Sequence, residues 1–199
     1  MKRETKSEKR KQAIISVITV LILVLSVLGI MVNRDSDLNS FKYSYNNKSI
    51  EFGKISNRYY LDFESGRVFF YNLPDQIQVN LSSDAANRIK NSQMIYVTFD
   101  PDESSQNLLY IDLVRLEIGE EFYKNNIYLI GGKTSNSSNY PGFPILDCEN
   151  ATAYIPVIKF IGSNTTEIVL EDNCIIMRGR NLDFIKYRDL ILYKFYGVY

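Results

Sequence analysis

One stretch of sequence decides the fold class: residues 94–132, MIYVTFDPDESSQNLLYIDLVRLEIGEEFYKNNIYLIGG. Its first six residues, Met94–Phe99, are apolar and β-prone, which predicts a buried strand. The acidic, Pro-containing residues 100–103 are typical of a helix start. A helix is predicted from about residue 102 to 123, where Leu109, Leu113 and Leu116 fall on one face. A second short strand is expected at 127–130, closed by two glycines.

Strand and helix patterns continue on both sides of this unit. Strands are expected before it at 41–45, 50–55, 59–63, 67–71 and 77–81, followed by a short helix at 83–91. After it, strands are expected at 154–161, 167–170 and 174–177, and a final helix at 181–196. The apolar face of that helix holds Phe184, Ile185, Ile191, Leu192 and Phe195. This order predicts one α+β domain over residues 41–199, a mixed sheet with helices packed on it.

The N-terminal region predicts a membrane anchor. Residues 13–32 contain no charged side chain, and as a helix they would rise about 30 Å, the thickness of a bilayer core. A cleaved signal peptide usually has a shorter apolar run and a clear small-residue cleavage site. Residues 1–12 form a basic tail with six Lys or Arg and two Glu, and residues 33–40 form a polar stalk. We therefore expect a cell-membrane protein with its N-terminus in the cytoplasm and its C-terminal domain outside.

Composition narrows the range of functions. The chain has 23 basic and 23 acidic residues, but residues 33–199 carry 17 basic against 21 acidic, which argues against nucleic-acid binding. The chain contains no His, the commonest general base and metal ligand. The sequence therefore singles out no catalytic residue, no cofactor site and no metal site.

Two cysteines, Cys148 and Cys174, lie in the predicted outer domain. In an oxidising compartment one disulfide is the simplest interpretation, and two free buried thiols are the alternative. Cys148 follows a candidate strand at 144–146, and Cys174 opens another. A bond between them would tie a variable loop region to the C-terminal strands and stabilise the fold by about 3–4 kcal/mol.

Five Asn-x-Ser/Thr sequons lie on the predicted outer side. They are Asn47, Asn80, Asn136, Asn150 and Asn164. Asn136 and Asn164 lie in the most loop-like stretches and are therefore the better candidates for glycosylation. Asn-rich loops could also produce such sequons without glycans.

Four alternative interpretations rest on shorter sequence patterns. Residues 131–134, GGKT, resemble the end of a phosphate-binding loop, but the Gly that this motif needs earlier is replaced by Ile127. Paired carboxylates or a Ser–Lys pair could serve a membrane-tethered hydrolase. The carboxylate candidates are Asp100, Asp102, Glu103, Glu120 and Glu121. A pilin-like subunit is a further alternative, although residues 33–37, NRDSD, are a poor continuation of a pilin helix.

Several short phrases resemble a family of uncharacterised archaeal proteins with one N-terminal membrane anchor. The phrases are Phe70–Pro74 (FYNLP), Tyr96–Pro101 (YVTFDP), Cys148–Thr152 (CENAT), Pro156–Ile158 (PVI) and Asn173–Ile175 (NCI). The resemblance covers about residues 50–199. It implies an anchor followed by an outer domain with a cysteine pair, and it implies no activity.

The sequence therefore predicts a single-pass protein that displays a domain outside the cell. Its expected role is binding or envelope structure. The expected partners are the lipid bilayer, through residues 13–32, and an envelope protein or glycan.

Overall fold

The computed structural model describes residues 15–26, 39–45 and 48–198. The strands are β1 (Asn39–Tyr45), β2 (Lys48–Ile55), β3 (Arg58–Phe63), β4 (Gly66–Phe70), β5 (Met94–Phe99), β6 (Tyr128–Gly131), β7 (Val157–Gly162), β8 (Glu167–Glu171) and β9 (Cys174–Gly179). The labelled helices are α2 (Ser83–Asn91), α3 (Ser105–Tyr123) and α4 (Leu182–Phe195), with short 3₁₀ turns η1 (Pro74–Gln76) and η2 (Cys148–Asn150). The α+β class is confirmed.

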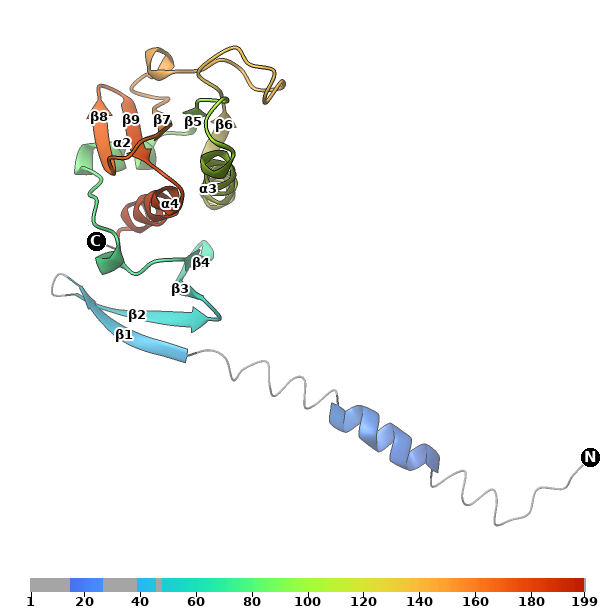
Figure 1. The fold of residues 1–199 in the computed structure, drawn as a ribbon. Helices are drawn as coiled ribbons and strands as arrows, with labels where there is room; N and C mark the ends of the chain where they lie inside the picture. The colour runs from blue at the N-terminus through green and yellow to red at the C-terminus, as the bar shows by residue number, and fades with distance from the viewer. Residues whose placement is uncertain (1–14, 27–38, 46–47, 199) are drawn as a thin grey trace, which may run out of the picture.

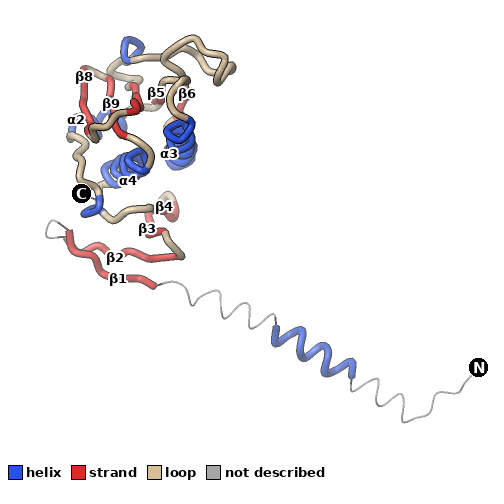
Figure 2. The backbone as a smooth tube through the Cα atoms, viewed as in Figure 1, coloured by secondary structure: helices blue, strands red, loops and turns tan. Residues whose placement is uncertain are grey.

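The strands form two separate sheets, whereas the sequence predicted one mixed sheet. Strands β1–β4 make an antiparallel meander in chain order. The second sheet has the order β6-β5-β7-β9-β8, in which β8 alone runs antiparallel to its neighbour. Helix α4 lies between the two sheets, with α2 and α3 beside it, so the fold has three layers (Figure 1). Figure 2 shows the same separation of the strands into two groups.

Helix α4 is buried on nearly all sides because both sheets pack against it. Ten of its 14 residues are buried, including Tyr187 and Tyr193. The Tyr193 ring stacks on Phe70 of β4 with centroids 4.1 Å apart, and its hydroxyl donates to the carbonyl of Asn72. One hydrophobic core consequently runs from Phe52 in the first sheet to Val198 at the end of the described chain. Among the described residues, both sheets and helices α2, α3 and α4 therefore contribute to one core.

The leucine stripe that predicted α3 faces outward. Leu109, Leu113 and Leu116 are exposed, and the helix instead buries Ile111, Val114, Ile118 and Phe122. The helix carries two apolar faces, and hydrophobic spacing alone does not say which of them meets the core. The helix also begins later than expected, at Ser105, where the Ser104 hydroxyl accepts a hydrogen bond from the Asn107 N–H.

Two further expectations are corrected. Residues 77–81 form no strand; they lead from η1 into α2, which is capped by Ser82 rather than by Ser83 or Asp84. The predicted strand at 144–146 is reduced to one parallel bridge between Lys133 and Ile145. Pro144 supplies no N–H, which limits the hydrogen bonds that this segment can donate to a ladder.

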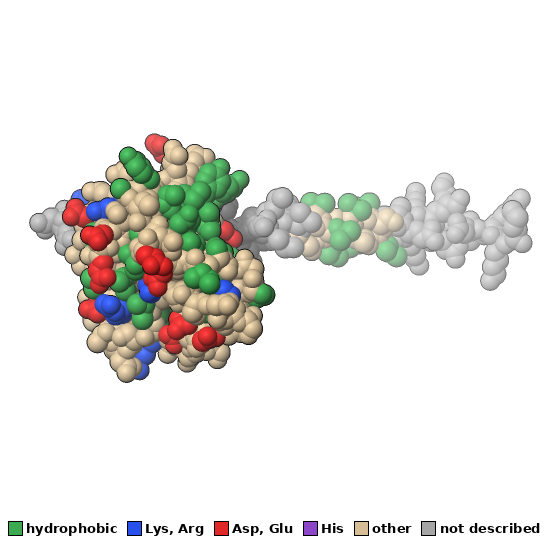
Figure 3. Space-filling view, turned by 90° about the horizontal axis from the view of Figure 1, so that it is seen from above, with side chains coloured by type: hydrophobic (Ala, Val, Ile, Leu, Met, Phe, Trp, Pro, Cys, Tyr) green, Lys and Arg blue, Asp and Glu red, His purple; other side chains and the backbone are tan. Residues whose placement is uncertain are grey.

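Part of the predicted membrane span lies within the described residues. Residues 15–26 are helical, and the hydroxyls of Thr19 and Ser26 donate to carbonyls one turn earlier. Hydrophobic side chains cover this short helix (Figure 3). Residues 13–14 and 27–32 of the predicted span, the basic tail at 1–12 and most of the stalk lie outside the described residues. Among the helices that are described, none has the length and apolar character needed to cross a bilayer.

Candidate functional site

A large concavity lies where three parallel strands begin. Because β5, β6 and β7 run in the same direction, the loops that precede them meet at one edge of the sheet. The lining comes from residues 90–94 at the end of α2 and the start of β5, residues 125–128 after α3, residues 154–155 before β7, and Phe195 at the end of α4. The concavity has a volume of about 1090 Å³, enough for a substantial ligand.

The lining combines amide and aromatic side chains. Asn91, Gln93 and Asn126 are exposed, so their amides can both donate and accept hydrogen bonds. Tyr154 is 85% exposed at this site, which leaves a flat aromatic surface for a ligand to stack against. Lys90 is the one charged residue in the lining, and no carboxylate contributes to it. This chemistry fits an uncharged polar ligand better than a cation.

The opposite edge of the sheet, where the strands end, is occupied by the chain itself. Ligands of open α/β sheets usually bind at that edge, between two neighbouring strands whose outgoing connections lead to opposite sides of the sheet. Here β5 leads to β6 on one side, and its neighbour β7 leads to β8 and β9 on the other. The Asp102 carboxylate after β5 accepts hydrogen bonds from the Ser137 hydroxyl at 2.8 Å and the Asn139 amide at 3.1 Å. These bonds hold the loop that follows β6 against this edge.

The five candidate carboxylates do not form one group. Asp100, Asp102 and Glu103 lie before the first turn of α3, whereas Glu120 and Glu121 lie in its last turn. A helix of this length separates the two groups by roughly 25 Å, against the 5–10 Å between the carboxylates of glycoside hydrolases. Glu121 bonds Lys124 at 2.7 Å, and Asp100 accepts the N–H of Asp102. Asp100, Asp102, Glu103 and Glu121 therefore have local structural partners.

The GGKT stretch extends the sheet instead of forming a phosphate cradle. The N–H of Gly132 donates to Val97, and that of Thr134 donates to Phe99, which continues the β6–β5 pairing. Lys133 is 4% exposed, and its ammonium donates to the carbonyls of Ser137 and Asn139 at 2.7 and 3.2 Å. The lysine thus organises the loop, and its backbone neighbours are already hydrogen-bonded.

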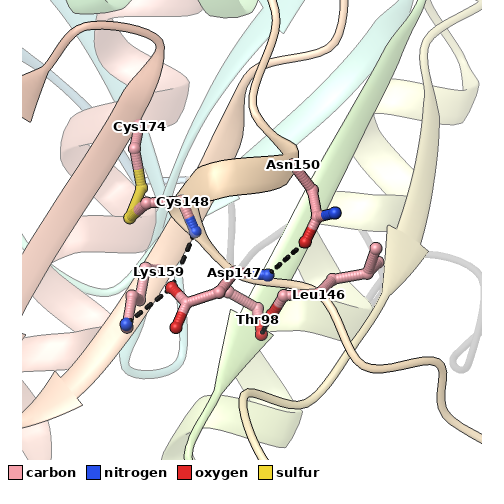
Figure 4. Close-up of a disulfide and its surroundings, with 7 residues drawn as sticks. All are labelled: Thr98, Leu146, Asp147, Cys148, Asn150, Lys159 and Cys174. Carbon is pink, nitrogen blue, oxygen red and sulfur yellow. Dashed lines mark hydrogen bonds and ion pairs between the residues drawn. A yellow bond between two sulfur atoms is a disulfide. The ribbon is translucent and has the colours of Figure 1, made fainter.

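The disulfide between Cys148 and Cys174 is present, with the two Cα atoms 5.2 Å apart. It fastens η2 to the start of β9, on the face of the large sheet opposite the helices (Figure 4). Two polar contacts reinforce the attachment. Lys159 of β7 bonds the Asp147 carboxylate at 2.6 Å, and the Thr98 hydroxyl of β5 donates to the carbonyl of Leu146. The loop is therefore held to three neighbouring strands.

A buried group of charges joins the first sheet to α4. Arg188 lies 2.8 Å from Asp189 and 3.1 Å from Glu117, and it also donates to the carbonyl of Phe69. Asp189 is fully buried, and one of its oxygens accepts the N–H groups of Tyr71 and Asn72. Burial raises the pKa of the Asp189 carboxyl, while Arg188 and Asn72 act in the opposite direction. The group holds two carboxylates, those of Asp189 and Glu117, and Arg188 alone balances one of the two charges. Arg58, 3.6 Å from Glu117, supplies the second positive charge.

Tyr71 is part of the same group. Its hydroxyl donates to Glu117 at 2.7 Å, and burial together with this carboxylate raises the pKa of Tyr71 to about 12. Arg188 and Asp189 lay beside the predicted apolar face of the last helix. Their partners in the first sheet could not be found from the sequence, because they are more than 100 residues away.

Four of the five sequons are described, and all four asparagines are exposed. Asn150 accepts the N–H of Asp147 within η2, and Asn164 accepts a hydrogen bond from Arg180. Asn80 and Asn136 lie in irregular segments. Asn47 lies outside the described residues. The four exposed positions are accessible to modification, and their use stays a prediction.

Comparison of the chain with known protein families, with curated proteins and with solved structures finds no match. The concavity is therefore the feature that bears on function.

The amide residues of the concavity were not predicted from the sequence, although the sequence contains a signal for them. Two similar polar runs, residues 90–93 (KNSQ) and 124–126 (KNN), stand at or just after the end of a helix and precede a short apolar strand. Parallel pairing of those two strands places the two runs side by side.

Proposed function

We propose that this chain is a single-pass membrane protein whose outer domain binds an uncharged glycan of the cell envelope in the concavity before β5, β6 and β7. The charge-free residues 13–32 and the basic tail before them support the anchor and its orientation. The observation that carries the binding role is the lining of the concavity, which offers several amides and exposed aromatic rings without a carboxylate.

A binding role accounts for the lining better than catalysis does. General acid–base chemistry needs titratable groups near the bound substrate, commonly with shifted pKa values. Four tyrosines have raised pKa values, and none of them lines this concavity; they are Tyr43, Tyr71, Tyr140 and Tyr187. Amides instead match sugar hydroxyls, which donate and accept, and an aromatic face matches the apolar face of a pyranose ring.

The proposal is tested by measuring binding of the purified full chain, in detergent, to an array of neutral and acidic oligosaccharides. We expect neutral oligosaccharides to bind. Tyr154→Ala and Asn91→Ala should each weaken binding by about tenfold, the effect of losing one ring contact or hydrogen bond.

Asn57→Ala is the matched control, because Asn57 is an exposed amide in the turn after β2, outside the concavity. It should bind as the wild-type chain does. Absence of binding to every oligosaccharide, or equal binding by all three variants, would contradict the proposal.

A further inference from the structure

One exposed tyrosine borders the concavity on each side of β5. The N–H of Tyr128 donates to the carbonyl of Gln93 at 2.9 Å, which places the start of β6 beside the start of β5. On the other side of β5, the N–H of Tyr96 donates to the carbonyl of Pro156 at 3.0 Å, just before β7 begins. Tyr154 lies two residues before Pro156 and lines the concavity there. The segment that leads into β5 therefore runs between Tyr128 and Tyr154.

The two tyrosine rings are open to solvent, and the surface between them carries amides. Tyr128 is 56% exposed and Tyr154 is 85% exposed. Asn91 and Gln93, which precede β5, are exposed as well. Neighbouring strands are about 4.8 Å apart, so the backbones of β6 and β7, which flank β5, are about 10 Å apart. One sugar ring is too short to contact both tyrosines across that distance.

We propose, on the basis of the glycan-binding role above, that the ligand is a linear chain of several sugar units that crosses the starts of β6, β5 and β7. One unit stacks on Tyr128, a later unit stacks on Tyr154, and the units between them bond the amides of Asn91 and Gln93. The volume of about 1090 Å³ fits a chain, because it exceeds the roughly 300–1,000 Å³ that usually encloses a small molecule.

Two stacking contacts on one chain make the affinity depend on chain length. Once one unit is held at the first tyrosine, the contact with the second forms within the same complex, at a high effective concentration. The affinity should therefore rise with length until the chain reaches both rings, and change little for longer chains. A site built for a single terminal sugar would show no such rise.

The test measures binding of the full chain, in detergent, to linear neutral glucans, galactans and mannans. Each glycan is supplied as a ladder from the monosaccharide to the hexasaccharide. We expect the dissociation constant for at least one of them to fall by about tenfold or more between the two ends of the ladder, which is the effect of one added ring contact.

Substitutions test each ring separately. Tyr128→Ala and Tyr154→Ala should each weaken binding of the hexasaccharide by about tenfold, and each should abolish the rise in affinity with length, because only one ring remains. Since both rings are exposed, neither substitution should change the urea concentration at which the chain unfolds. Tyr45→Ala, in β1 of the other sheet and outside the concavity, is the matched control. It should bind every length as the wild-type chain does.

The outcomes separate the chain-shaped ligand from glycan binding itself. Equal affinity at every length, or a rise that persists in both variants, would overturn the inference and leave the proposed function in place. A hexasaccharide that only one of the two substitutions weakens would overturn it as well. No binding at any length would also overturn the inference, and no binding to any oligosaccharide of the array would contradict the proposed function too.

Discussion

Replacing Asp189 by Asn tests whether the buried charges hold the two sheets together. The side chains have nearly the same shape, but both oxygens of Asp189 face donors. Arg188 donates to one oxygen at 2.8 Å, and three N–H groups of Tyr71 and Asn72 donate to the other at 2.8–3.0 Å. An Asn would place its NH₂ group against a donor in either orientation. It would also leave the Arg188 charge short of one partner.

The expected loss is large because the site is closed to water. Removing one partner of a buried ion pair costs about 3–5 kcal/mol, and an unsatisfied buried donor costs about 1–3 kcal/mol. These two effects overlap, so we expect Asp189→Asn to lower the free energy of unfolding by about 4 kcal/mol. Asn72→Ala removes only one of the donors and should cost about 1 kcal/mol.

The assay is urea unfolding of the full chain in detergent, followed by tyrosine fluorescence and far-ultraviolet circular dichroism, because the chain has no Trp. Asp62→Asn is the control: Asp62 pairs with Arg67 at 2.8 Å, but its side chain is 63% exposed, so little change is expected. If Asp189→Asn unfolded at the same urea concentration as Asp62→Asn, the charges would not be holding the layers together.

Three further predictions follow from particular contacts. Replacing both Cys148 and Cys174 by Ser should lower the free energy of unfolding by about 3 kcal/mol, and alkylation of the unreduced, unfolded chain at two thiols would show that the bond is absent. Tyr71 and Tyr140 have pKa values raised to about 12, so in an absorbance titration they should ionise after the exposed tyrosines. Because these pKa values exceed the ordinary 10, the stability that they contribute below pH 10 should be lost between pH 10 and 12; ionisation of all tyrosines near pH 10 without unfolding would contradict this. Protease added to intact spheroplasts should digest the chain beyond about residue 40, and protection of the C-terminus would contradict the predicted orientation.

The strand and helix positions could largely be predicted because their signals are local. The final helix was expected at 181–196 and is observed at Leu182–Phe195. The strand predicted at Met94–Phe99 is observed with the same bounds. A short run of β-prone apolar residues between polar ones is typical of a buried strand. Where local signals conflicted, the prediction failed: residues 77–81 have strand-like alternation, but they follow the 3₁₀ turn at Pro74–Gln76 and pair with no described strand.

Facts that depend on distant contacts could not be predicted. The orientation of α3 depends on which of its apolar faces meets α4, and the sequence contains two such faces. The separation into two sheets depends on α4 packing between them, which no spacing within residues 41–71 reveals. The concavity depends on parallel pairing of β5, β6 and β7, so its lining residues were individually unremarkable polar residues in the sequence.

The layer order explains why two hollows of the surface lie at the borders of the large sheet. One face of that sheet is covered by α2, α3 and α4, and the other face is covered in part by the loop that the disulfide fastens. Residues after β6 occupy the edge where the strands end. Among the described residues, two concavities border this sheet. One lies where the parallel strands begin, and the other lies between α3 and β6. Tyr128 lines both hollows, so the site proposed for a glycan adjoins the groove between α3 and β6 at that residue.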